Sequence, residues 1–209
     1  MFNSKAFRCI LGFLFFGSVW GFSESTFGDW LYLQEIPHAS VYLTAIAFII
    51  IASSKVFLSY RWTGTMLGLI AMLFKLVNVP FFACHLLAIF LLGAGFDIAC
   101  ELVTRLYAGR FSLPVIGIMG NYIGRALFAV IITYVVQYHY WTEAGLPRVI
   151  DYIFISGSIS ALISMIAIPI GNYIGKNIWG FTCSKLHPRF SIAAVFVTIL
   201  SIWIIQLKI

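Results

Sequence analysis

Five ionisable side chains lie inside long apolar stretches of the chain: Glu24, Lys75, Asp97, Glu101 and Arg125. A charge in an apolar setting is costly, so such residues usually pair with one another or serve a ligand, an ion or a proton pathway. Glu101 falls near the end of its stretch and precedes Arg105 by four residues. We expect these two side chains to pair on one helix face.

The other four ionisable residues fall at two matching depths. Counting about 1.5 Å per helical residue from the nearest end of each stretch gives Glu24 and Lys75 one depth, and Asp97 and Arg125 another. An acid and a base at the same depth can neutralise each other when their helices are neighbours. The sequence therefore predicts a Glu24–Lys75 contact and a buried Asp97–Arg125 charge pair, each either a structural ion pair or part of a ligand site.

No motif for a metal, a cofactor or a catalytic nucleophile is present in the sequence. The histidines lack HExxH spacing and the cysteines lack a CxxC pair, so we expect neither a metal nor a cofactor. The segment SGS at 156–158 differs from the GxSxG nucleophile elbow. The chain also lacks the GxxxxGK[ST] loop that cradles ATP phosphates. Enzymatic activity is therefore disfavoured, and we expect no ATP hydrolysis.

The composition indicates what kind of element positions these residues. The 209 residues are 62% hydrophobic and 10% charged, against roughly 25% charged in soluble domains. Each membrane-spanning helix needs about 20 apolar residues. We therefore expect one all-α integral membrane domain, residues 1–209, a polytopic bundle of six to seven spans. The expected spans are 6–27, 41–60, 63–80, 82–106, 113–138, 150–175 and 190–207.

Basic residues predict the orientation, because cytoplasmic loops carry an excess of Lys and Arg. With the N-terminus in the cytoplasm, Arg148 and Lys208 fall outside, and the remaining loop cations fall inside. The inner group comprises Lys5, Arg8, Lys55, Arg61, Arg105, Arg110, Lys176, Lys185 and Arg189. We expect the chain in a bacterial cytoplasmic (inner) membrane, surrounded by the lipid bilayer.

The net charge of +6 does not indicate a nucleic-acid partner. The basic residues occur singly between apolar runs, whereas tracking a phosphate backbone needs a cluster of them. We therefore expect no nucleic-acid binding.

Small residues recur at four-residue spacing and predict close helix packing. The pairs are Gly17 with Gly21, Gly64 with Gly68, Gly120 with Gly124 and Gly171 with Gly175. Packing within the chain accounts for most such pairs. On the first helix, the face that carries Gly17 and Gly21 leads to Glu24, so this pair joins a packing surface to a carboxylate.

Three stretches resemble the substrate-binding S components of energy-coupling factor transporters. They are GSVWGFSESTFGDWLYL at 17–33, GLIAMLFKLVNVP at 68–80 and HLLAIFLLGAGFDIACELV at 85–103. The chain's size and helix count are also similar to those of that family, whose members have six helices and no soluble domain. The expected span 190–207 lies beyond the six-helix pattern.

The resemblance implies a substrate pocket toward the outer face, below the first outer loop. The matching pocket positions are Glu24, Trp30, Lys75, Asn78, His85 and Trp141. It also implies that Gly12, Gly17 and Gly21 face the coupling helices of a transmembrane partner subunit, with cytoplasmic ATPases supplying energy. A vitamin-like or other small polar solute would be the ligand.

We therefore expect the substrate-binding membrane subunit of a small-molecule uptake transporter. One alternative is a non-catalytic membrane scaffold or assembly subunit, and another is an intramembrane lipid-modifying enzyme. A substrate binder predicts an outward cavity lined by Glu24, Lys75 and aromatic residues. A scaffold predicts direct contact of Glu24 with Lys75 and no cavity, whereas an enzyme predicts polar groups at headgroup level with a lateral opening.

Overall fold

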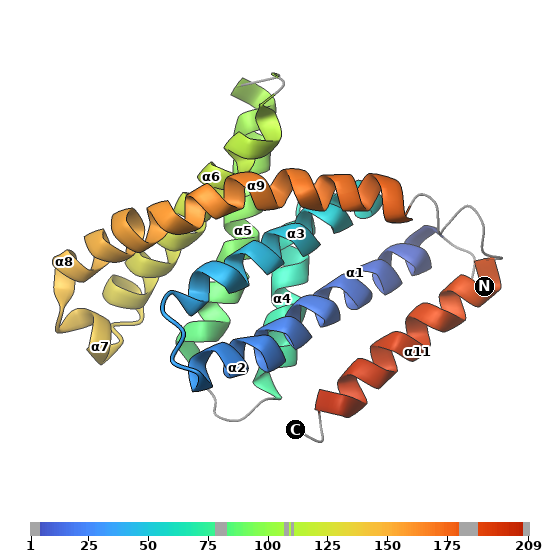
Figure 1. The fold of residues 1–209 in the computed structure, drawn as a ribbon, viewed down its shortest axis with the longest axis horizontal. Coiled ribbons are helices and arrows are strands. Elements are labelled where there is room, and N and C mark those ends of the chain that lie inside the picture. Colours follow the sequence, from blue (N-terminus) through green and yellow to red (C-terminus); the bar gives the residue numbers. More distant parts are fainter. Residues whose placement is uncertain (1–4, 78–82, 107–108, 110, 180–187, 207–209) are drawn as a thin grey trace.

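The computed structural model describes residues 5–77, 83–106, 109, 111–179 and 188–206, and every regular element within these ranges is helical (Figure 1). The α-helices are α1 (Lys5–Phe22), α2 (Gly28–Leu33), α3 (Ala39–Leu58), α4 (Thr63–Leu76), α5 (Ala83–Leu106), α6 (Ser112–Val130), α7 (His139–Thr142), α8 (Gly145–Ile150), α9 (Gly157–Ile174) and α11 (Pro188–Gln206). The π-helices are η1 (Ser23–Phe27), η2 (Ile131–Val135), η3 (Asp151–Ser156) and η4 (Gly175–Trp179).

Among the described residues, five helical segments are long and apolar enough to cross a bilayer, which indicates an integral membrane protein. They are Cys9–Leu33, Ala39–Leu58, Cys84–Leu106, Ser112–Val135 and Gly145–Asn177. The expected six to seven spans are not confirmed. Helix α4 has 14 residues, or about 21 Å of rise, against a hydrocarbon core of about 30 Å. The apolar segment Ala193–Gln206 is part of α11, which has 19 residues.

The first span differs from the predicted range 6–27, because it continues to Leu33. The predicted range 6–27 left the acidic and aromatic residues after Phe27 beyond the end of the first span. In the structure η1 runs without a break into α2, so Asp29 and Tyr32 are helical. The extra turns place both side chains against neighbouring helices.

The long helices pack side by side in a closed ring. In order around the ring they are α1, α4, α5, α6, α9 and α3, with α3 returning to α1. Helix α11 lies outside this ring against α1, at the edge of the view in Figure 1. Trp20, Phe48 and Leu67 are fully buried and belong to the main apolar core.

Glycines set the closest approaches between neighbouring helices. A Cβ atom on Gly64 would lie 2.6 Å from the backbone oxygen of Gly93, so α4 and α5 meet backbone to backbone.

The face of α1 predicted to meet a partner subunit is covered within the chain. A Cβ on Gly12 would meet Leu58 of α3, and one on Gly17 or Gly21 would meet α4. A partner helix would therefore have to approach another face of α1.

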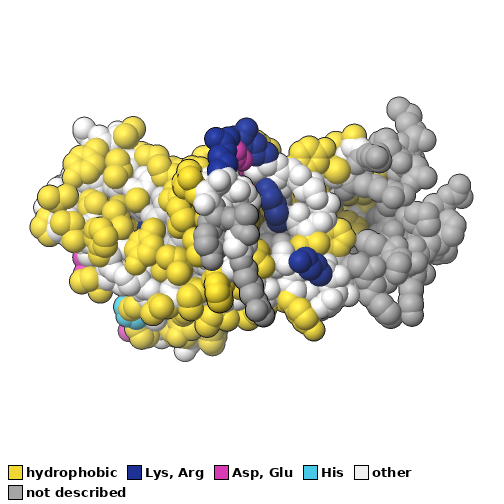
Figure 2. Space-filling model, turned by 90° about the horizontal axis from the view of Figure 1, so that it is seen from above, with side chains coloured by type: hydrophobic (Ala, Val, Ile, Leu, Met, Phe, Trp, Pro, Cys, Tyr) yellow, Lys and Arg dark blue, Asp and Glu magenta, His cyan; other side chains and the backbone are white. Residues whose placement is uncertain are grey.

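Basic side chains gather at one end of the ring, around Glu101. Arg61 and Arg105 both form salt bridges with Glu101, at 3.2 Å and 2.5 Å, and the Glu101–Arg105 pair predicted from the sequence is confirmed. Lys55 donates to the backbone oxygens of Tyr60 and Arg61 nearby. Figure 2 shows Lys and Arg side chains grouped with acidic atoms among them, while apolar side chains cover much of the surface beside them.

Candidate functional site: a polar cavity at the end opposite the basic cluster

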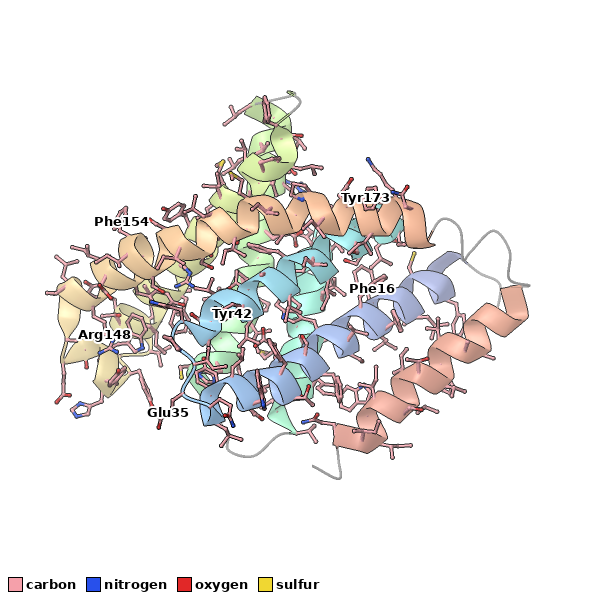
Figure 3. All side chains as sticks on the ribbon, viewed as in Figure 1. Phe16, Glu35, Tyr42, Arg148, Phe154 and Tyr173 are labelled. Atoms are coloured by element: carbon pink, nitrogen blue, oxygen red, sulfur yellow. The ribbon has the colours of Figure 1, made fainter. Side chains whose placement is uncertain are left out.

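A cavity of about 90 Å³ lies among the helix ends far from the basic cluster. The cavity is lined by residues from the first turns of α3 and α5 and from the last turn of α4. The basic cluster, Lys55, Arg61 and Arg105, lies at the opposite ends of these helices. Figure 3 labels Glu35 and Arg148 near the cavity end, away from Tyr173 on α9. The polar lining residues are Glu24, Tyr32, Ser40, Thr44, Lys75, His85, Arg125 and Tyr152.

Glu24 reaches the cavity from the π-helix η1. A π-helical turn, with its i to i+5 hydrogen bonds, is rare and is often found at functional sites, and the amide of Gly28 bonds the carbonyl of Ser23 in this pattern. The indole nitrogen of the buried Trp20 donates to Oε1 of Glu24 at 3.1 Å. No described residue forms a hydrogen bond with Oε2 of Glu24, so this oxygen is available to a group inside the cavity.

Lys75 pairs with an acid other than the predicted one. Its Nζ lies 2.7 Å from Oδ1 of Asp29 and 3.3 Å from the backbone oxygen of Glu24. The predicted contact with the Glu24 carboxylate is therefore replaced by a contact with the Glu24 carbonyl. Because the first helix continues through η1 and α2, it brings Asp29 over the end of α4.

Arg125 enters the cavity from α6 and is only 4% exposed. Its Nε donates to Oδ1 of Asn121 at 3.3 Å. Its Nη1 donates to Oγ of Ser156 at 3.1 Å and to the carbonyl of Tyr152 at 3.5 Å. The guanidinium also lies 4.7 Å from the centre of the Tyr152 ring, within cation–π range. Ser156 and Tyr152 both come from η3, so a second π-helix shapes the site.

The predicted Asp97–Arg125 pair does not form, because Asp97 has other partners. Its carboxylate accepts hydrogen bonds from the amides of Gly64 and Thr65, at 3.0 Å and 2.7 Å, and from the Thr65 hydroxyl at 2.8 Å. Lys55 approaches it at 3.9 Å. The first amides of a helix lack partners within that helix, and Asp97 of α5 supplies them for α4. Within the described ranges, no carboxylate forms a salt bridge with Arg125.

Aromatic side chains form two of the walls. Tyr32 and His85 stack with 5.5 Å between ring centres and 17° between planes. On another side, Tyr152 and Phe128 line the cavity, and Trp141 packs behind both of them, outside the lining. The lining therefore includes a stacked pair, Tyr32 with His85, and a second aromatic pair, Phe128 with Tyr152.

Only some of the positions that the resemblance assigned to a substrate pocket line the cavity. Glu24, Lys75 and His85 line the cavity. Trp30 is 51% exposed and stacks on Phe27, outside the lining. Asn78 lies outside the described residues.

The sequence interpretation missed several lining residues. Tyr32 was interpreted as an interfacial anchor rather than as a cavity residue. Tyr152 was not singled out, because it lies in η3 and a π-helix is difficult to recognise from side-chain types. Arg125 was singled out for its buried charge but was assigned to a different partner. The described residues contain no cluster of three metal-ligating side chains.

The comparisons with known proteins found no matching family model, no matching curated protein and no matching solved structure. A small cavity with two cationic groups, a carboxylate and aromatic walls is suited to binding a small polar solute.

Proposed function

We propose that this chain is the substrate-binding membrane subunit of an uptake transporter for a small polar solute. The observation that carries the proposal is the cavity lined by Glu24, Lys75, Arg125 and stacked aromatic rings. A cavity holding unpaired hydrogen-bonding groups inside an apolar bundle is costly to keep, and intramembrane charges that face a cavity commonly mark a solute pathway. A scaffold gains no stability from such a cavity.

The direction of transport follows from the distribution of charge. The described cluster of Lys55, Arg61 and Arg105 lies at one end and the cavity toward the other. By the positive-inside rule, the basic end faces the cytoplasm. The cavity then faces the outside of a bacterial inner membrane, which suits uptake.

Energy would come from partners, since the sequence lacks a GxxxxGK[ST] phosphate-binding loop. The resemblance to S components of energy-coupling factor transporters supports a transmembrane coupling subunit with cytoplasmic ATPases. The glycine face of α1 is covered by α3 and α4. We therefore place the coupling contact on another lipid-facing surface of the ring.

Native mass spectrometry of the gently solubilised protein, expressed in its own host, tests this proposal. We expect a bound molecule of small mass on the wild-type chain, and a loss of more than about tenfold in its occupancy in Glu24→Gln, since a charged contact is lost. Glu143→Gln is the matched control, because Glu143 is an exposed acid outside the lining.

The alternatives predict different spectra. A chain that carries no small molecule, combined with equal losses of thermal stability in Glu24→Gln and Lys75→Met, would indicate a scaffold. A chain that carries only lipid, bound through the same residues, would indicate a lipid-modifying enzyme.

A further inference from the structure

We propose that the solute is a zwitterion whose anionic group binds Arg125 and whose protonated amine binds Glu24. This inference rests on the proposed binding function and specifies its substrate class. The inference is based on two side chains of opposite charge that line one cavity, Arg125 and Glu24. Each has one atom without a hydrogen-bond partner among the described residues: Nη2 of Arg125 and Oε2 of Glu24.

Arg125 is held in place with part of its guanidinium left available. Asn121 fixes Nε, and Ser156 together with the Tyr152 carbonyl fixes Nη1. None of the described residues accepts a hydrogen bond from Nη2. The three existing partners are neutral groups, so the positive charge is oriented but not neutralised. A planar guanidinium held in this way is suited to a carboxylate or a phosphate.

Glu24 shows the complementary arrangement. Trp20 fixes Oε1 of its carboxylate, and no described donor reaches Oε2. The nearest cation, Lys75, directs its ammonium to the carboxylate of Asp29 and to the backbone oxygen of Glu24. The side-chain charge of Glu24 therefore has no direct ion pair among the described residues.

The charge balance of the site distinguishes a zwitterion from a simple anion or cation. Lys75 and Asp29 neutralise each other at 2.7 Å, which leaves the charges of Arg125 and Glu24. An unpaired charge inside an apolar bundle is destabilising, so a ligand that supplied only an anion would leave the Glu24 carboxylate without an ionic partner. A ligand that supplied only a cation would leave Arg125 uncompensated. A molecule that carries both groups satisfies both residues.

The test is chemical identification of the small molecule that the full-length protein retains when purified from its own host. The molecule is released by denaturation and treated in separate portions with dansyl chloride, which labels amines, and with a carbodiimide plus an amine, which labels carboxylates and phosphates. Mass spectrometry then reads each added mass. We expect the same molecule to gain both labels.

The outcomes separate this inference from the proposed function. A retained molecule that gains one label or neither overturns the zwitterion while leaving the binding function intact. Retention of no small molecule overturns both.

Variants test the assigned contacts independently. Arg125→Met and Glu24→Gln should each lower occupancy by more than about tenfold, with Arg125→Lys retaining more ligand than Arg125→Met because the charge is kept. Thermal unfolding of each variant in detergent shows whether it has folded. Equal occupancy in folded Arg125→Met and wild type would overturn the assignment of the anionic group to Arg125.

Discussion

Asp97 shows how a single buried acid can join two helices. It is 2% exposed and accepts hydrogen bonds from two backbone amides at the start of α4, as well as from the Thr65 hydroxyl. These amides have no carbonyl partners within their own helix. A side chain from α5 therefore acts as a tertiary cap on α4, and its charge is used in stability rather than in the cavity.

Removing the Asp97 side chain should destabilise the folded protein. We expect Asp97→Ala to lower the free energy of unfolding by about 2–4 kcal/mol, because buried amides lose their acceptor. The matched control is Glu101→Gln, which alters a partly exposed salt bridge worth about 1 kcal/mol or less. Unfolding in mixed micelles, followed by circular dichroism, measures both. Equal losses would show that the amides find other partners.

A Trp→Phe substitution at Trp20 and at Trp30 tests which of the two residues belongs to the binding cavity. Trp20 is fully buried and holds the Glu24 carboxylate through its indole nitrogen, whereas Trp30 is half exposed and stacks on Phe27. We expect Trp20→Phe to weaken ligand binding by about threefold to tenfold, as one oriented hydrogen bond to a charged group is lost. Trp30→Phe should leave the affinity unchanged.

Isothermal titration with the retained molecule measures both affinities. If Trp30→Phe weakened binding as much as Trp20→Phe, Trp30 would belong to the pocket, as the resemblance implied, and its position outside the cavity lining would be wrong.

At the scale of elements, π-helical turns determine what faces the cavity. Each adds a residue to a turn, which rotates the following side chains by about 100° relative to an uninterrupted α-helix. Glu24 lies inside η1, and Tyr152 and Ser156 lie inside η3. The two π-helices thus supply the carboxylate and the groups that orient Arg125.

Close backbone packing determines how the helices that carry these residues meet. We expect Gly64→Ala to destabilise the protein by about 1–3 kcal/mol, because its Cβ would lie 2.6 Å from the Gly93 carbonyl and would force α4 away from α5. Gly28→Ala is the control, since its Cβ would meet only the Leu43 side chain at 3.4 Å. The midpoint of thermal unfolding compares them, and similar midpoints would contradict tight α4–α5 packing.

At the scale of the whole molecule, the basic cluster and the cavity occupy opposite ends, and the orientation can be measured. Gln34 and Phe111 are exposed at the cavity end and the basic end, respectively. In a cysteine-free background, we expect Gln34→Cys to react with a membrane-impermeant maleimide in intact cells. Phe111→Cys should react only after the cells are permeabilised. The reverse pattern would turn the cavity toward the cytoplasm and contradict an uptake function.

Much of this architecture could be predicted from the sequence. Long apolar runs predicted a helical membrane protein, and isolated charges predicted Glu24, Lys75 and Arg125 as residues of interest. The prediction of six to seven spans is not confirmed: five helical segments of the described residues are long and apolar enough to cross a bilayer, and α4 has only 14 residues. Hydropathy reports composition along the chain, but it does not report where a helix ends.

The sequence by itself determined that the chain is apolar, helical and membrane-embedded, because the transfer of each side chain into lipid depends on that side chain and its neighbours in sequence. Only the tertiary structure decided which charges meet. Lys75 pairs with Asp29, Asp97 caps α4 and Arg125 faces η3. Such pairing depends on which helices are neighbours and how each is rotated, and these follow from glycine contacts and π-helical turns spread along the whole chain.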